Sequence, residues 1–122
     1  MQQNLVNSTL PTDHLIYAAP DLAAAVEAMD RPAVLLAVLE YDQASSTSPL
    51  FSNPLPRQLT EDEFGPTNLQ RPMPGQAGAQ RFVSSGGRAF CVYAVLGSYA
   101  LRRVLVPELN RVLGTLTIDP AL

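Results

Sequence analysis

The sequence predicts an α/β (α+β) domain in which two principal helices pack on a mainly antiparallel sheet of four to six strands. Several apolar runs have the length of a strand, and two other segments repeat apolar residues at helical spacing. A Gly-Gly pair between two apolar arms adds the signal of an antiparallel hairpin. The 122 residues have the length of one domain, so we expect a single domain over residues 1–122.

The first quarter of the chain predicts one strand and one helix. Residues 1–11 are polar and indicate a tail, and the apolar centre of 12–19 predicts a strand. Pro20-Asp21 is a helix-start signal, and apolar residues then recur at helical spacing through an alanine-rich run. We therefore expect the first helix over 21–29, because the residue before Pro32 resists the α conformation.

Residues 33–41 form a run that is apolar on both sides of a strand until Glu40 and Tyr41 mark its exit to the surface. Such a run is typical of a central strand whose two faces are both covered. A buried helix is the alternative interpretation, because periodicity alone does not separate the two.

A Pro-rich excursion follows over residues 42–76, with six prolines that rule out a regular central element. Thr60 and Glu63 have the spacing of a capping box, and Leu59 and Phe64 have that of a hydrophobic staple, which predicts one short helical turn. Segments of this length without regular structure tend to be functional or disordered. The apolar residues scattered along it predict that it drapes over the core.

The hairpin signal lies between 78 and 97. Gly86-Gly87 permits the positive φ angles of a two-residue turn, and the second arm, 90–96, is apolar throughout and predicts a core strand. Ser98 can cap a helix over 99–115, within which Pro107 predicts a kink or the start of a second segment. Residues 116–120 predict a last short strand.

The composition excludes several kinds of chemistry. The net charge is −3 and the chain has no lysine, which argues against nucleic acid and against lysine-based catalysis. There is one cysteine, so no internal disulfide forms, and no apolar stretch is long enough to span a membrane. The polar start lacks the pattern of a secretory signal, so we expect a cytoplasmic protein.

No complete catalytic or metal site emerges from the residue types that carry such chemistry, so we predict no catalytic residues, no metal and no cofactor. His14 is the only histidine, and a metal ligand role with Glu40 or Glu108 is less favoured than a strand-end position. Ser98 fits a helix cap better than a nucleophile, and Cys91 fits a buried apolar residue better than a reactive thiol. The acidic run 61–63 fits the start of a helix, where its charge meets the helix dipole.

Two resemblances to known families follow from longer patterns. A buried strand, a long Pro-rich excursion, the hairpin F-x-S-x-G-G-R-A-F-C-V-Y-A-V-L and a helix ending V-P-E-L-N-R-V-L-G-T-L-T-I succeed one another over 32–120. This order is similar to that of the small bacterial PsbP-like and LpqN-like α/β/α sandwich domains. The resemblance implies a binding or assembly module whose function is set by its partners.

The second resemblance covers 13–27, D-H-L-I-Y-A-A-P-D-L-A-A-A-V-E, which looks like the opening strand and helix of glyoxalase-like, vicinal-oxygen-chelate proteins. It implies a metal-dependent enzyme, or a small-molecule-binding relative, with His14 as a ligand. The family also uses a second histidine, which this chain lacks.

The function that the sequence favours is a non-enzymatic binding or scaffolding module of PsbP-like type, with the glyoxalase-like protein as the alternative. We expect the partner to be another protein, and homo-oligomer formation stays open. The excursion is the expected contact surface because it combines apolar residues with little charge. The predicted binding residues are Phe51, Leu55, Phe64, Leu69, Arg71 and Met73.

Overall fold

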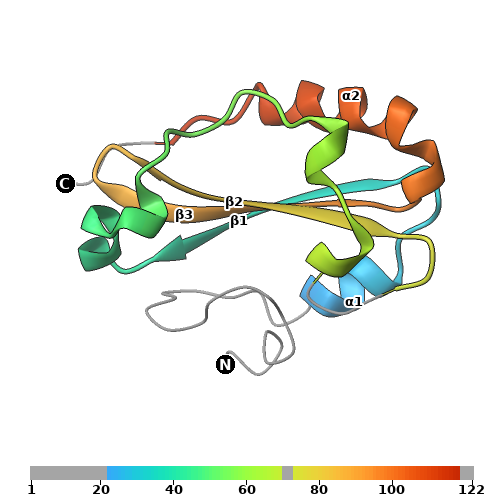
Figure 1. Cartoon of the computed structure of the whole chain (residues 1–122), viewed down its shortest axis with the longest axis horizontal. Coiled ribbons are helices and arrows are strands. Elements are labelled where there is room, and N and C mark those ends of the chain that lie inside the picture. Colours follow the sequence, from blue (N-terminus) through green and yellow to red (C-terminus); the bar gives the residue numbers. More distant parts are fainter. Residues whose placement is uncertain (1–21, 70–72, 119–122) are drawn as a thin grey trace.

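The computed structural model of the chain describes residues 22–69 and 73–118, which form one antiparallel sheet with a helix on each face (Figure 1). The strands are β1 (Val34–Tyr41), β2 (Ala77–Ser85) and β3 (Arg88–Leu96), and their order across the sheet is β1-β3-β2. The helices are α1 (Leu22–Glu27) and α2 (Arg102–Leu113). This combination of an antiparallel sheet and two helices is consistent with an α+β arrangement.

The expected sheet of four to six strands is wrong, because the sheet of the described residues has three. The strand predicted over 12–19 lies outside the described residues. Residues 116–118, where we predicted a last strand, have no regular structure. Leu116 and Ile118 instead lay their side chains, half-buried, against the core, so this segment buries apolar surface without pairing its backbone in the sheet.

Among the described strands the central one is β3 and not the run at 33–41, which corrects a second expectation. Gly86 and Gly87 have φ angles of 59° and 80°, as a type I′ turn requires, so β2 and β3 form the predicted hairpin. β1 pairs with the other side of β3 and thereby becomes an edge strand of the described sheet. Residues 89–96 of β3 are all buried, whereas in β1 only Leu39 and Tyr41 are.

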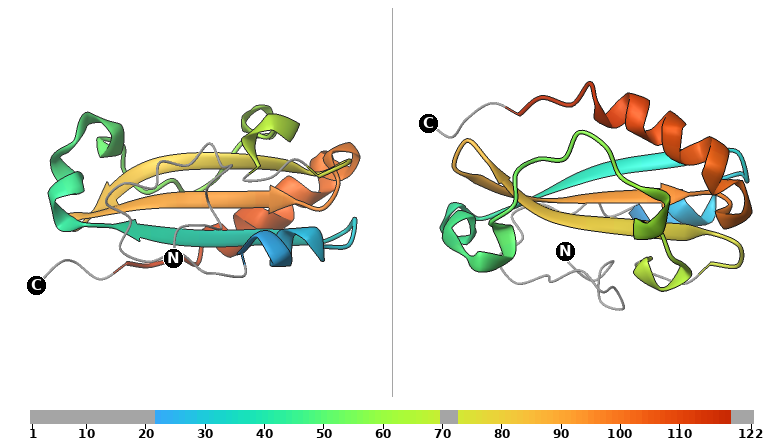
Figure 2. Two further views of the ribbon diagram at one scale, coloured as in Figure 1. Left: turned by 90° about the horizontal axis from the view of Figure 1, so that it is seen from below. Right: turned by 45° about the horizontal axis from the view of Figure 1, so that its top comes forward.

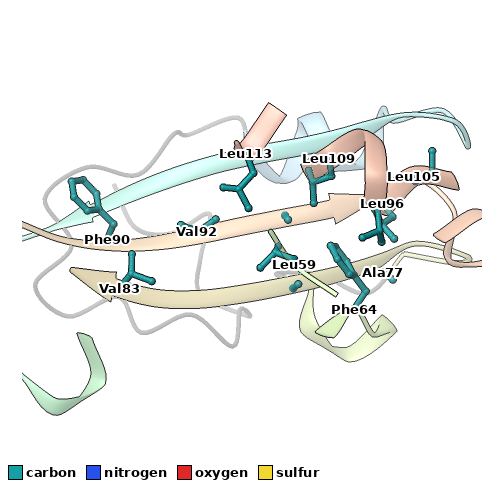
Figure 3. Packing of buried hydrophobic residues seen from close by; sticks show 13 residues of the cluster. Leu59, Phe64, Ala77, Val83, Phe90, Val92, Leu96, Leu105, Leu109 and Leu113 are labelled. Atoms are coloured by element: carbon teal, nitrogen blue, oxygen red, sulfur yellow. The ribbon is translucent and has the colours of Figure 1, made fainter. Parts of the chain in front are cut away.

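The sheet carries an apolar core on each face. We call the core between the sheet and α2 the α2-side core, and Figure 3 shows Leu105, Leu109 and Leu113 of α2 above Val92 and Leu96 of β3. We call the core on the opposite face the α1-side core; it contains Val26 of α1 and the β3 residues Cys91 and Tyr93. Alternate residues of β3 enter the two cores, as the twofold repeat of a strand dictates.

The helices differ in detail from the expected ones. α1 is shorter than the predicted 21–29, and α2 is preceded by a 3₁₀ turn at Tyr99–Leu101. Ser98 precedes that turn but its side chain makes no capping hydrogen bond. Pro107 lies within α2 on its exposed side, where water can satisfy the carbonyl of Arg103 that loses its helical partner.

The excursion wraps around the outer edge of β2 (Figures 1 and 2). Its described residues form four short 3₁₀ turns, and the one at Glu61–Glu63 has the predicted capping box between Thr60 and Glu63. Its backbone meets β2 at two isolated bridges, Asn53 with Val83 and Gly65 with Gly78. Apolar residues before the first bridge and after the second enter the α1-side core, and those between the bridges enter the α2-side core. The excursion thus crosses the edge of β2 twice, once at each bridge.

Candidate functional site

The predicted binding residues lie on both faces of the sheet. Phe51, Leu69 and Met73 belong to the α1-side core, and Leu55 and Phe64 belong to the α2-side core. Phe51, Phe64 and Leu69 are no more than 4% exposed. Arg71 lies outside the described residues. The structure therefore does not bring these side chains together on one surface; the part they play in partner binding stays a prediction.

The core contacts of these residues explain how the excursion is held in place. The Phe51 ring packs against Tyr41, with 5.0 Å between ring centroids, and against Phe82, at 5.8 Å. On the opposite face, Leu59 is fixed to α2 by a pair of hydrogen bonds. Its N–H donates to Oδ1 of Asn110 at 2.7 Å, and its carbonyl accepts from Nδ2 of Asn110 at 2.9 Å. The amide of Asn110 thus mimics a neighbouring backbone.

The acidic run 61–63 also serves the fold. Glu63 accepts hydrogen bonds from the backbone and hydroxyl of Thr60, and its other carboxylate oxygen accepts from Nε of Arg81 on β2. Burial raises the pKa of Glu63, but the hydrogen bonds from Arg81 and Thr60 outweigh it and leave that pKa lowered. This carboxylate is therefore an ionised anchor between the excursion and the sheet.

The groups considered for catalysis do not form a site within the described part of the chain. Cys91 is fully buried, as predicted, and burial raises the pKa of its thiol to about 12, so the reactive thiolate does not form at neutral pH. His14 lies outside the described residues. Among residues 22–69 and 73–118, no three His, Cys, Asp or Glu side chains lie close enough together to hold a metal ion.

The feature of the surface that offers a binding geometry is the outer edge of β1. The N–H of Gly97 donates to the carbonyl of Ala33 at 2.8 Å, so the backbone of residue 33 faces β3. Because backbone groups alternate sides along a strand, those of Leu35, Ala37 and Leu39 face β3 as well. The N–H and C=O groups of the intervening residues point away from the sheet. These outward-facing residues are Val34, Leu36, Val38 and Glu40.

No described segment hydrogen-bonds to this outer edge, which contrasts with the edge on the other side of the sheet. On β2 the outward groups of Gly78 exchange hydrogen bonds with Gly65, and the N–H of Ser84 donates to the carbonyl of Asn53 at 2.9 Å. The Pro-rich excursion therefore protects one edge of the described sheet and leaves the other open.

The side chains of β1 make the open edge apolar. Its eight residues include no proline, glycine, lysine or arginine, which are the usual devices that discourage edge pairing. Residues 34–38 are all half-buried, so apolar surface remains accessible on both faces of the strand. The single charge is Glu40, which accepts two hydrogen bonds of 2.8 Å from the guanidinium of Arg88; this pairing lowers the pKa of Glu40.

Sequence reasoning missed this site because it placed 33–41 at the centre of the sheet. The Gly86-Gly87 turn predicts that β2 pairs with one side of β3, but it does not determine whether the far side of the strand at 33–41 is paired, so the sequence carried no signal for this edge.

Comparisons with known proteins leave the identity of the chain open. No protein-family model, curated protein or solved structure matches it. The resemblances to PsbP-like, LpqN-like and glyoxalase-like proteins therefore stay predictions. Within the described residues, no helix combines the length and the apolar character needed to cross a membrane.

Proposed function

We propose that the chain is a non-enzymatic protein-binding module that holds an extended segment of its partner as an added strand on the outer edge of β1. The observation that carries the proposal is the row of outward-facing backbone groups on an apolar edge strand of eight residues. Such an edge is a template for strand addition, in which main-chain hydrogen bonds supply affinity.

The half-buried side chains of β1 would supply specificity. Residues 34, 36 and 38 contribute apolar surface on the α2 side of the strand, and residues 35 and 37 contribute it on the α1 side. A partner strand with apolar residues on both of its faces would add one row of side chains to each core. Burying apolar surface stabilises a complex by about 25 cal/mol per Å².

The protected edge of β2 supports placing the contact on β1 instead of on the excursion. Large apolar side chains of the excursion are buried in the two cores, and its backbone pairs with β2 at two positions. It thereby restricts strand addition to one side of the described sheet.

The test compares two valine-to-lysine variants of the full chain as immobilised baits. Val38→Lys places a flexible charge on the open edge, whereas Val104→Lys makes the same chemical change on α2, where Val104 is 68% exposed. Both variants are first checked for the wild-type amide spectrum. We expect the proteins captured by wild type and by Val104→Lys to be depleted at least about tenfold by Val38→Lys, a change equivalent to about 1.4 kcal/mol.

The captured partner is then added to the labelled chain and amide exchange is measured. The Leu36 and Val38 amides should become protected on binding, because their N–H groups point outward. Equal capture by all three baits, or unchanged exchange at these two amides, would refute the proposal.

A further inference from the structure

We propose that the strand added to β1 is β1 of a second copy of the chain, so that two three-stranded sheets join into one across a twofold axis. This inference rests on the proposed function, because it names the partner of the same edge. It starts from the geometry of the four outward-facing residues, which is self-complementary in an antiparallel pair.

One register of the pair satisfies every outward group. When Ala37 faces its symmetry mate, Val34 lies opposite Glu40 and Leu36 lies opposite Val38, and each combination occurs twice. Each of the four resulting pairs exchanges two N–H···O=C bonds, because all the participating residues have their backbone groups on the outer side. A shift of the axis to Leu36 or to Val38 leaves the outward groups of at least one residue per copy unpaired. The pairing is isologous, which is the arrangement a closed dimer requires.

The side chains fit this register. Across the axis Ala37 meets Ala37 of the other copy in a non-hydrogen-bonded pair, where strands approach most closely and small side chains are tolerated. The only charge of the strand, Glu40, lies opposite Val34 and is already neutralised by Arg88 of its own copy. No like charges therefore face each other, and every other pair is apolar on apolar.

The two helices lie towards one end of β1. Figure 1 shows α1 and α2 near the end of the sheet at which β1 begins, and the opposite end of β1 carries neither. In an antiparallel pair, the helix-bearing end of one copy meets the helix-free end of the other. The contact is confined to one strand per copy, so we expect it to fall at the small end of specific interfaces.

The first experiment measures the mass of the purified chain by sedimentation equilibrium over a dilution series. We expect a mass that rises from 13.1 kDa towards twice that value with concentration. Val38→Lys should weaken the association at least about tenfold, and Val104→Lys should leave it unchanged. A chain that stays at 13.1 kDa up to about millimolar concentration would overturn the inference.

The second experiment tests the register by disulfide trapping in a thiol–disulfide buffer. Ala37→Cys places its thiol opposite its symmetry mate at a Cα separation of about 4.5 Å, which a disulfide spans. In Leu35→Cys, on the same face, the two thiols are offset by four residues, roughly 14 Å along the strand. We expect covalent dimers at least about tenfold faster from Ala37→Cys, because pairing in the dimer raises the effective thiol concentration. Equal rates would overturn the register.

The two proposals fail in different ways. If the purified chain stays a monomer but Val38→Lys still loses a captured partner of another mass, the edge binds a different protein and only the second copy is excluded. If Val38→Lys alters neither association nor capture, the edge itself is not the binding site.

Discussion

Asn110→Ala tests whether the excursion is held on the sheet by its clamp to α2. The substitution removes two hydrogen bonds, of 2.7 and 2.9 Å, to the backbone of Leu59. Leu59 is only 2% exposed, so its N–H and C=O cannot turn to water without local opening. At about 0.5–1.5 kcal/mol for each bond, the loss is about 1–3 kcal/mol. The higher helix propensity of alanine stabilises α2 by roughly 0.5 kcal/mol and offsets part of this loss.

We therefore expect the free energy of unfolding in urea to fall by about 0.5–2.5 kcal/mol, with a midpoint temperature lower by up to several degrees. Arg111→Ala is the matched control, because it changes the next residue of the same helix and removes only an exposed ion pair with Glu108. It should leave the midpoint of urea unfolding close to that of wild type, because exposed ion pairs contribute little to stability.

Trypsin provides a local readout, because the exposed Arg57 lies two residues before Leu59. Cleavage after Arg57 should accelerate in Asn110→Ala and not in Arg111→Ala. If Asn110→Ala matched the control in both stability and cleavage, the clamp would not hold the excursion and the reasoning would be wrong.

Three further substitutions test the close contacts and buried groups of the core. Gly97→Ala would set a Cβ 2.0 Å from the carbonyl oxygen of Asp30, so we expect a loss of about 3–5 kcal/mol in urea unfolding. Gly114→Ala would set its Cβ 3.3 Å from the carbonyl oxygen of Asn110, a much milder contact, and should cost less than Gly97→Ala. Burial raises the pKa of Cys91 from 9.0 to about 12, so the thiol ionises in the unfolded chain before it ionises in the folded one. The free energy of unfolding therefore falls as pH rises from 9 towards 12, and Cys91→Ala should make that fall less steep by up to about 1.4 kcal/mol per pH unit. Identical slopes for wild type and Cys91→Ala would contradict the burial argument. The hydrogen bonds from Arg88 lower the pKa of Glu40, so the pair stabilises the fold above the ordinary pKa of 4.5 and this contribution is lost as pH falls below it. Arg88→Met should therefore cost about 0.5–1 kcal/mol at pH 7 and much less at pH 3, and an equal cost at both values would exclude the ion pair as its source.

The local features of the fold were predictable because each depends on neighbouring residues. Gly86-Gly87 requires no partner elsewhere to favour a type I′ turn, and its positive φ angles confirm the prediction. The same holds for the capping box of Thr60 and Glu63. The apolar run at 90–96 predicted a core strand because no residue in it tolerates exposure, and all seven positions are buried.

The strand order was not predictable from apolar patterning, because the runs at 33–41 and 90–96 are both apolar on both faces. What separates them is topology: β3 is shared by two antiparallel pairings and β1 takes part in one. The predicted number of strands was wrong for a related reason. An apolar segment such as 116–118 can bury its side chains against a sheet without joining it.

The clamp between the excursion and α2 was beyond sequence reasoning because it depends on a long-range contact. Asn110 and Leu59 are 51 residues apart, and nothing local to either predicts their pairing. The excursion was predicted to drape over the core, and its apolar residues do enter both cores. The interpretation of these same residues as a partner surface stays a prediction, and the burial of Phe51, Phe64 and Leu69 is the reason why the proposed contact lies on β1 instead.

The excursion bears on function through the edge that it protects. By crossing β2 at the Asn53 and Gly65 bridges, it ties down outward-facing groups at both ends of that strand. An open edge on each side would let added strands propagate without limit, as in fibrous aggregates. With β2 covered, a second copy can add only through β1, and an isologous pair then closes after two copies. Removing the excursion would therefore take core residues and edge protection together, so substitutions on β1 are the way to separate binding from folding.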